Sequence, residues 1–309
     1  MRSSPQLLPR FNGHNLYFGN KAVASNQLFA TAPSAARSFS RMWWAAAAAA
    51  VLVVALLHGN RAAAIPPPLV LCAEPRIWVV ENFLNDSEVD ALLEHALGTP
   101  RCWEVQPSGR QATCDLEGRA ASDLAASALM RSIDARVAVE LSAPNVSYVE
   151  KGYLQEYSPG YLTHNLHLDQ GSVMVPARIA SAIVYLDTQT AGSGHTVFPF
   201  ACQPRRGSGA GAALREAWNA RLQAGRIASR FFRPGEYGHE LFEVARRECA
   251  AGAGVRPVRG SAVFFEHRTQ GLETIDAAHA SCPLPPTPSG KAGANKRVLV
   301  KIACDGVVR

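Results

Sequence analysis

The sequence predicts a mixed α+β protein in which a β-sandwich or jelly roll of short strands is braced by helices. Two helical patterns lie between residues 85 and 141, and short β-patterned segments separated by Gly and Pro turns follow from residue 148. No internal repeat is visible. The length of 309 residues allows one or two domains, and 48% hydrophobic residues is ordinary for a globular core.

The first part of the chain is basic and differs in composition from the rest. Residues 1–41 are rich in Ser, Ala and Asn, so we expect a disordered segment. The formal net charge of +6 arises within residues 1–73, which carry six basic side chains and no acidic one. The basic pI therefore does not indicate nucleic-acid binding by the remainder, in which the charges balance.

Residues 42–58 form a hydrophobic stretch. The 16 apolar residues from Met42 to Leu57 follow Arg37 and Arg41. Positive charge before such a stretch predicts a single-pass, type II signal-anchor with the C-terminal part of the chain in the lumen of the endoplasmic reticulum or Golgi. A late signal peptide of a secreted protein and an organelle transit peptide remain alternatives.

Seven cysteines allow three disulfides with one thiol left over, as a secretory route would permit. None forms a CxxC motif, which argues against a zinc ribbon. Loop closure and chain position suggest the pairs Cys102–Cys114, Cys202–Cys249 and Cys282–Cys304. Two acceptor motifs for N-glycosylation, at Asn85 and Asn145, agree with a lumenal glycoprotein.

A Pro-rich linker at 59–75 is expected to lead into the folded domain, 76–309. The segment 76–80 reads as a strand. Asn85 caps the following helix with Glu88 three residues on, and residues 120–141 have helical spacing. The later strands are expected at 148–157, around His167-Leu168-Asp169, and at 178–186, 196–199, 255–266 and 296–303.

The segment 203–254 interrupts the strands. It contains a possible helix at 212–231, and ten Arg and five Glu lie between Gln203 and Arg256. Charge runs usually lie on the surface, which favours a solvated insertion. A basic lid over a substrate groove is the alternative.

One short pattern is suited to binding a metal. His167 and Asp169, two residues apart on a strand, would point to the same face. Two such ligands and a distant histidine match the facial triad of non-haem Fe(II) sites, and His279 is the candidate. His279 could also be a structural histidine. His164 is a rival ligand, but no acidic residue lies two positions after it.

The order of these motifs resembles the catalytic domain of prolyl 4-hydroxylases, within the Fe(II)/2-oxoglutarate dioxygenases. The resemblance covers roughly residues 76–304 and implies a double-stranded β-helix (jelly-roll) core with flanking N-terminal helices. The motifs that carry it are His167-Leu168-Asp169, the strand from Arg178 to Tyr185-Leu186, Thr196-Val197-Phe198-Pro199, Gly260-Ser261-Ala262-Val263-Phe264-Phe265, His279-Ala280-Ser281-Cys282-Pro283, Gly290-Lys291 and Asn295-Lys296.

The resemblance also implies roles for individual residues. The catalytic metal ligands would be His167, Asp169 and His279. Lys291 would form a salt bridge with the distal carboxylate of 2-oxoglutarate. The remaining roles are cosubstrate binding near Tyr157 and Thr196 and substrate binding by Arg178. The implied cofactors are Fe(II), 2-oxoglutarate, O2 and L-ascorbate.

The implied activity is that of a procollagen-proline 4-dioxygenase-like enzyme acting on a protein or peptide, possibly Pro-rich, with no nucleic-acid partner. Two aromatic positions of the family pattern are Ala292 and Arg297 here. This departure keeps open a lysine or small-molecule substrate. A catalytically inactive binding domain is a rival, and a zinc hydrolase is disfavoured because no His-Glu-x-x-His motif is present.

Overall fold

The part of the chain that the computed structural model describes comprises residues 68–98, 103–105, 111–115, 124–141, 146–150, 152–159, 166–170, 177–202, 210–227, 230–232, 235–285 and 295–305. It lies within one unit, Pro66–Arg309. The basic segment expected at 1–41, the anchor at 42–58 and residues 59–67 of the linker lie outside it and stay predictions. Among the described residues, no helix has both the length and the apolar character needed to cross a membrane.

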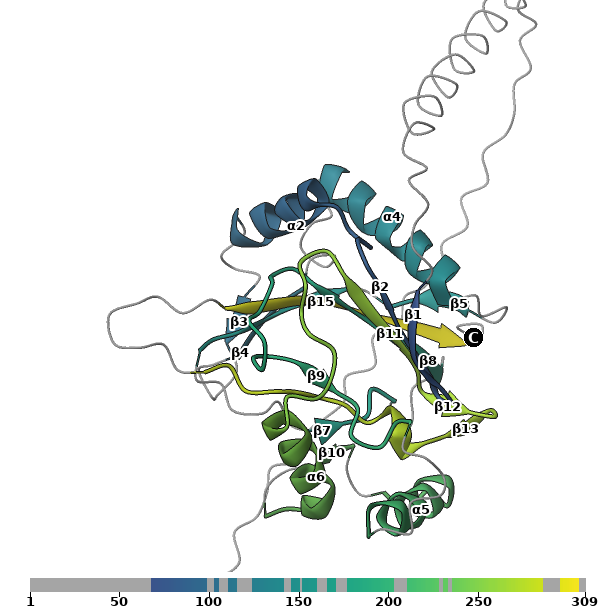
Figure 1. Cartoon of the computed structure of the whole chain (residues 1–309). Coiled ribbons are helices and arrows are strands. Elements are labelled where there is room, and N and C mark those ends of the chain that lie inside the picture. Colours follow the sequence, from purple (N-terminus) through teal and green to yellow (C-terminus); the bar gives the residue numbers. More distant parts are fainter. Residues whose placement is uncertain are drawn as a thin grey trace, which may run out of the picture. The chain divides into compact units, whose positions relative to one another are not determined.

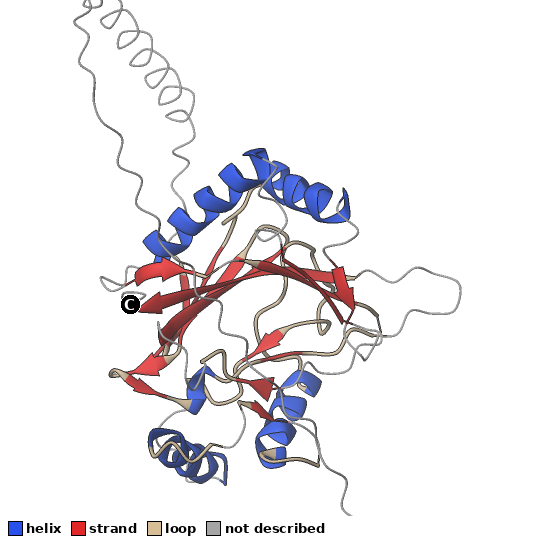
Figure 2. Ribbon diagram, turned by 180° about the vertical axis from the view of Figure 1, so that it is seen from behind, coloured by secondary structure: helices blue, strands red, loops and turns tan. Residues whose placement is uncertain are grey.

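The largest element within these ranges is a nine-stranded antiparallel sheet, so the fold is mixed α/β with one dominant sheet (Figures 1 and 2). Its order is β1-β2-β11-β8-β15-β6-β4-β3, and β5 also pairs with β15. The strands are β1 (Leu69–Ala73), β2 (Arg76–Val80), β3 (Trp103–Val105), β4 (Gln111–Asp115), β5 (Val146–Val149), β6 (Tyr153–Tyr157), β8 (Ala177–Tyr185), β11 (Ala262–Glu266) and β15 (Lys296–Asp305). The single strand expected at 148–157 is divided into β5 and β6, which both pair with β15.

A second, smaller layer of short strands faces the main sheet (Figure 1). It contains β7 (Leu166–His167), β9 (Thr196–Val197), β10 (Phe231–Phe232) and β14 (Ala280–Ser281), in the pairs β10-β7 and β14-β9. Isolated bridges join His167 to His279 and Thr196 to Val255. These two facing layers are consistent with the expected jelly roll. The connection before β14 holds a short hairpin, β12 (Arg268–Thr269) and β13 (Leu272–Glu273), and a 3-10 turn, Ile275–Ala277.

Helices α2 (Asp86–Gly98) and α4 (Leu124–Leu141) cover the outer face of the main sheet (Figures 1 and 2). The predicted cap of α2 is confirmed: the Asn85 side chain accepts from the Glu88 backbone N–H at 3.0 Å, and the Glu88 carboxylate accepts from the Asn85 N–H at 2.9 Å. Buried side chains of both helices pack against Phe264 and Leu299 of the sheet.

The other face of the main sheet forms the core between the two strand layers. Side chains alternate along each strand, so Val263 and Phe265 of β11 and Val298 of β15 face inward while their neighbours face the helices. This inner core also contains Tyr157 and Tyr185. A polar site on the inner face is therefore surrounded by apolar walls.

The insertion at 203–254 contributes a third core instead of lying free in solvent. It contains α5 (Ala210–Gln223), β10 and α6 (His239–Ala250), whereas the sequence predicted one helix at 212–231. Trp218, Phe232 and Leu241 are buried against Leu166 and Leu168, which flank the predicted ligand His167. The interpretation as a solvated insertion is therefore wrong for these elements, which form the packing behind β7.

Two disulfides differ from the predicted pairs. The structure joins Cys72 to Cys202 and Cys249 to Cys282, each with Cα atoms 5.3 Å apart. Cys304 is a buried thiol outside these disulfides, and its Sγ donates to Glu150 Oε1 at 3.3 Å. The predicted pairs Cys202–Cys249 and Cys282–Cys304 are wrong, because β15 lies in the middle of the main sheet while Cys282 follows the minor strand β14. The predicted Cys102–Cys114 pair includes a residue outside the described ranges.

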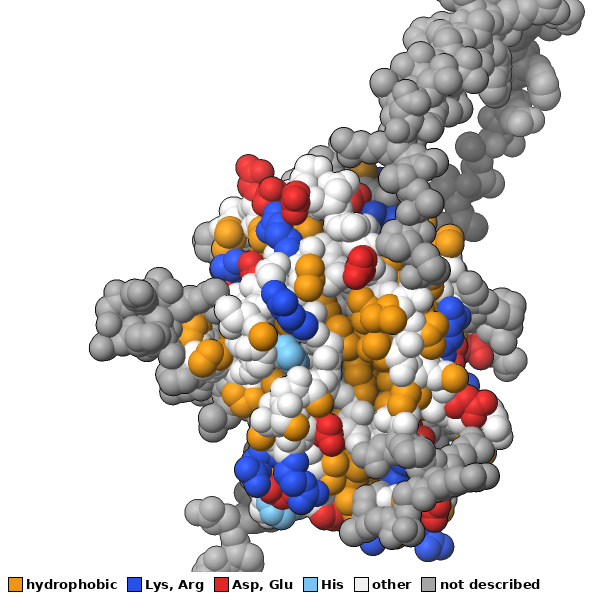
Figure 3. Space-filling view, viewed as in Figure 1, with side chains coloured by type: hydrophobic (Ala, Val, Ile, Leu, Met, Phe, Trp, Pro, Cys, Tyr) orange, Lys and Arg blue, Asp and Glu red, His pale blue; other side chains and the backbone are white. Residues whose placement is uncertain are grey.

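The edge strand β1 exposes apolar side chains. Leu69, Val70 and Leu71 are 61%, 52% and 42% exposed. Beside it, an apolar groove with about 620 Å³ of empty space, including its opening to solvent, is lined by residues that include Ile77 and Phe198. Figure 3 shows that hydrophobic side chains gather in the middle of this face of the molecule.

Candidate metal centre

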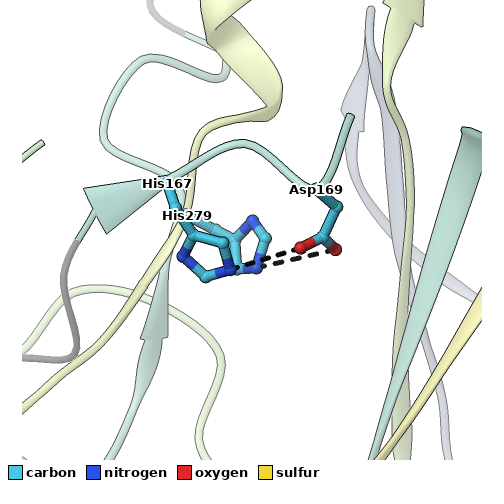
Figure 4. A group of neighbouring side chains, drawn as sticks. All are labelled: His167, Asp169 and His279. Carbon is cyan, nitrogen blue, oxygen red and sulfur yellow. Dashed lines mark ion pairs between the residues drawn. The ribbon is translucent and has the colours of Figure 1, made fainter. Parts of the chain in front are cut away.

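Three predicted ligands meet in the structure (Figure 4). Their side-chain ligand atoms all lie within 4.8 Å of one another, and no other such group occurs in the ranges that the structure describes. The His167 Nε2 lies 3.2 Å from one carboxylate oxygen of Asp169, and the His279 Nε2 lies 3.9 Å from the other. The structure brings together the three residues that the sequence predicted as ligands, although β7 ends at His167 and Asp169 lies just beyond the strand. Their role as ligands stays a prediction.

Backbone pairing brings the two histidines together. β7 and the residue before β14 form an antiparallel bridge, and the imidazole centroids of His167 and His279 lie 4.3 Å apart. On the other edge of β7, Phe231 of β10 pairs with His167 and its ring lies parallel to the imidazole at 5.5 Å. The insertion thus supplies both a strand partner and a ring contact to one predicted ligand.

The protonation states suit a metal centre. Burial alone would raise the pKa of Asp169, but the neighbouring His279 and His167 lower it well below its ordinary value. Burial, with His167 nearby, lowers the pKa of His279 to about 3, so this imidazole is neutral near pH 7. The His279 Nδ1 lies 3.3 Å from the carbonyl oxygen of Ala277, to which it can donate. Its Nε2 is then left as a lone-pair donor directed at the carboxylate.

Two imidazoles and one carboxylate on one side of a site are the donor set of the facial triad that holds Fe(II) in non-haem oxygenases. All three donors line the same cavity. The residues present therefore fit such a metal ion, which would be held by His167, Asp169 and His279.

A cavity adjoins the three ligands and has about 400 Å³ of empty space, including its opening to solvent. One lysine, Lys296 at the start of β15, is buried in its wall with 2% of its surface exposed. Its Nζ donates to Ser281 Oγ at 2.6 Å and lies 5.5 Å and 5.8 Å from the ring centroids of Tyr157 and Tyr185. Burial lowers the pKa of Lys296 to about 7. Among the residues that the structure describes, Lys296 contacts this hydroxyl and the two aromatic rings, and an anionic ligand would supply a counter-charge to its protonated form.

The other predicted cosubstrate residues are placed as follows. Tyr157 and Thr196 line the cavity. Thr196 Oγ1 accepts from the Tyr185 hydroxyl at 2.8 Å, and Tyr157 donates to Gln155. Lys291 lies outside the described ranges, so its predicted role is untested.

Arg178 contacts the backbone of the predicted ligand Asp169. Its guanidinium forms two 2.7 Å hydrogen bonds with Glu150, and its Nη1 donates to the backbone carbonyl of Asp169 at 2.9 Å. These contacts connect β8 to the residue that supplies the metal-binding carboxylate. Substrate binding by Arg178 stays a prediction.

Sequence reasoning missed several residues of the site. The cavity is also lined by Tyr153, Gln155 and Ser281, and Ser181 contacts Asp169 from β8. Ser281 lies two residues after His279 on an extended segment, so the two side chains point to the same face. This spacing was the one signal in the sequence that Ser281 would line the same cavity.

No family model matches the chain, and no curated protein matches it. Solved structures with a similar arrangement include a viral collagen prolyl hydroxylase from Paramecium bursaria Chlorella virus-1 in complex with 2OG, at 14% identity and TM-score 0.46, covering 76% of this chain and 99% of the viral one. A Pseudomonas putida prolyl-4-hydroxylase has 14% identity and TM-score 0.41, with 76% and 94% of the two chains covered. HygX from Streptomyces hygroscopicus, with nickel, 2-oxoglutarate and hygromycin B bound, has 12% identity and TM-score 0.40, with 74% and 82% covered. At these identities and TM-scores, the function has to be argued from the site itself.

Proposed function

We propose that the chain is a Fe(II)- and 2-oxoglutarate-dependent dioxygenase. The observation that carries the proposal is the meeting of His167, Asp169 and His279 beside a cavity whose wall holds the buried Lys296. When bound, Fe(II), 2-oxoglutarate and O2 supply the chemistry that oxidises 2-oxoglutarate to succinate and CO2 and inserts the second oxygen atom into a C–H bond of the substrate.

The chain's own residues would bind the metal, bind and orient the cosubstrate, and exclude water from the cavity. His167, Asp169 and His279 would hold the metal at the wall of the cavity that they line. Lys296 would bind the distal carboxylate of 2-oxoglutarate, with Ser281, Tyr157 and Thr196 beside it. The apolar side chains Ile183, Val298 and Val300 in the same wall restrict water and strengthen the charge pairing.

For the substrate we propose a peptidyl proline, on the resemblance of the motif order to prolyl 4-hydroxylases, with L-ascorbate as reductant. One departure from the family pattern is Arg297, which stands at an aromatic position of that pattern. In this chain Arg297 forms ion pairs with Glu156 at 2.6 Å and Asp187 at 3.6 Å. A lysine or small-molecule substrate and a non-catalytic binding role are the alternatives that the experiment below distinguishes.

We also propose that the domain works in an oxidising compartment, as the predicted membrane anchor and lumenal orientation require. The disulfides Cys72–Cys202 and Cys249–Cys282 support this, because disulfides persist mainly along the secretory route. Expression of the tagged full chain followed by protease protection of microsomes tests the orientation. Digestion of the domain in intact vesicles would contradict it.

The test of activity uses the purified full chain reconstituted with Fe(II). We expect succinate to form from 2-oxoglutarate, faster with a Pro-rich peptide than without, and the peptide to gain one oxygen atom by mass spectrometry. His279→Ala should abolish turnover, whereas His95→Ala, on α2 across the main sheet, should leave it unchanged. Metal binding without turnover on any peptide, lysine or small-molecule substrate would favour the non-catalytic alternative. Absence of both would contradict the proposal.

A further inference from the structure

A buried serine and a buried histidine form a chain of hydrogen bonds with Asp169 on the side that faces away from the cavity. The Ser181 hydroxyl donates to the Oδ2 of Asp169 at 2.6 Å, and the Nε2 of His267 lies 2.8 Å from the same hydroxyl. Ser181 is fully buried and His267 is 1% exposed. Neither residue lines the cavity, so neither would touch a bound cosubstrate.

The main sheet holds this pair in place. Ser181 is in β8 opposite Phe265 of β11, and His267 directly follows β11. The His267 backbone N–H donates to the carbonyl of Ile179 at 2.8 Å, and the Gln170 side chain donates to the His267 carbonyl. Asp169 is thus connected to the rigid sheet through its side chain, in addition to the bond from Arg178 to its backbone.

The donors and acceptors can be assigned in one consistent way. An ionised carboxylate only accepts, so the hydroxyl proton of Ser181 points at Asp169. The Ser181 oxygen must then accept, which requires His267 to carry its proton on Nε2. The Nδ1 of His267 is buried and has no hydrogen-bond partner among the residues that the structure describes. The chain of hydrogen bonds therefore runs in one direction, from His267 to Ser181 to Asp169.

We propose that Ser181 and His267 are positioning residues for the metal-binding carboxylate. The Ser181 hydroxyl, which His267 holds, bonds to Oδ2 of Asp169, and this oxygen also lies 3.9 Å from the His279 Nε2. The bond favours Oδ1, which lies 3.2 Å from the His167 Nε2, as the oxygen offered to the metal. A carboxylate that offers one oxygen leaves more coordination positions for other ligands than one that offers two. This inference rests on the proposed function, since it presupposes a metal on the three ligands.

The test measures Mn(II) affinity of the metal-free full chain by isothermal titration calorimetry, together with its melting temperature. Loss of a partner that orients a metal ligand typically weakens binding about 10–100-fold, and we expect this of Ser181→Ala. His267→Leu should weaken binding less, because it acts through the serine. Ser261→Ala is the matched control, since Ser261 is also buried but bonds to the Val258 carbonyl.

A double-mutant cycle separates positioning from a general structural role. If His267 acts through Ser181, the double variant should bind Mn(II) no more weakly than Ser181→Ala alone. Ser181→Thr, which keeps the hydroxyl, and His267→Gln, which keeps an N–H donor, should restore much of the affinity. If Ser181→Ala does not fold, the Mn(II) affinities of these two conservative variants still test the inference.

Two results would overturn the inference: an unchanged Mn(II) affinity in Ser181→Ala, or additive losses in the double variant. A fall in the metal-free melting temperature with no change in affinity would show a structural role only and would also overturn it. Failure of the parent chain to bind Mn(II) would instead contradict the proposed function. The two failures are therefore distinguishable in one set of titrations.

Discussion

The backbones of His167 and His279 are hydrogen-bonded to each other in both directions. The N–H of His167 donates to the carbonyl of His279 at 3.1 Å, and the N–H of His279 donates back at 3.0 Å. Two residues far apart in the chain are thus aligned by the protein's own strand pairing. The metal would bind to ligands that are already in place, which limits how much of the fold can depend on it.

Removal of the metal should therefore leave the domain folded. After chelation, we expect unchanged far-ultraviolet circular dichroism and a cooperative thermal transition. Adding Mn(II) at 100 times its dissociation constant should stabilise the native state by about 2.7 kcal/mol. Loss of secondary structure on chelation would show that the ligand strands need the metal to pair.

Lys296 should anchor the anionic cosubstrate. A hydrogen bond to a charged group contributes about 1.5–3 kcal/mol, so Lys296→Met should weaken 2-oxoglutarate binding at least about tenfold. Lys291→Met is the matched comparison, because the motif order assigned the same role to Lys291. Titration of 2-oxoglutarate into both variants loaded with Mn(II) decides between them. A loss confined to Lys291→Met would return the role to the sequence-based assignment.

The same lysine predicts a pH dependence. Burial lowers the Lys296 pKa from 10.5 to about 7, so between these pH values the unfolded chain holds a proton that the ligand-free native chain releases. Stability from this residue therefore rises as the pH increases from 7 to 10.5. A bound dicarboxylate favours the charged lysine, so binding at pH 8 should take up a proton. Calorimetry in buffers of different ionisation enthalpy measures this uptake, which Lys296→Met should remove.

The meeting of His167 and Asp169 could be predicted because their spacing is a local pattern. The two-residue spacing predicted a common face for His167 and Asp169, although Asp169 lies beyond the end of β7, and the motif order pointed to His279. The helix cap at Asn85 and Glu88 was predictable for the same reason, since its hydrogen bonds span three residues.

Features that depend on long-range packing were not predictable. Periodicity shows that α5 has an apolar face but not what covers it, so its burial against Leu168 was missed. The pairing of Cys249 with Cys282 depends on where α6 lies beside β14. The burial of Lys296 follows from the position of β15 between β8 and β6, which sequence spacing does not contain.

The Cys249–Cys282 disulfide should stabilise the segment that carries His279. It ties α6 to the chain just after β14 across a sequence separation of 33 residues. Replacing both cysteines by Ala should lower the free energy of unfolding by about 2–4 kcal/mol, as measured by urea denaturation. Cys304→Ala, which breaks no disulfide and removes only the thiol hydrogen bond to Glu150, should cost less. Equal losses in the two variants would contradict the assigned pairing.

The insertion should affect metal binding through Phe231. Its ring lies parallel to that of His167 at 5.5 Å and is 46% exposed, so Phe231→Ala removes a contact to a metal ligand with little loss of buried surface. Aromatic pairs contribute about 0.5–1.5 kcal/mol, which corresponds to a roughly 2- to 13-fold weaker Mn(II) affinity. Tyr237→Ala is the matched control, because Tyr237 is 38% exposed on the same insertion and its ring contacts Trp218 instead. Equal Mn(II) affinities in the two variants would show that the insertion supports β7 only through its backbone and buried core.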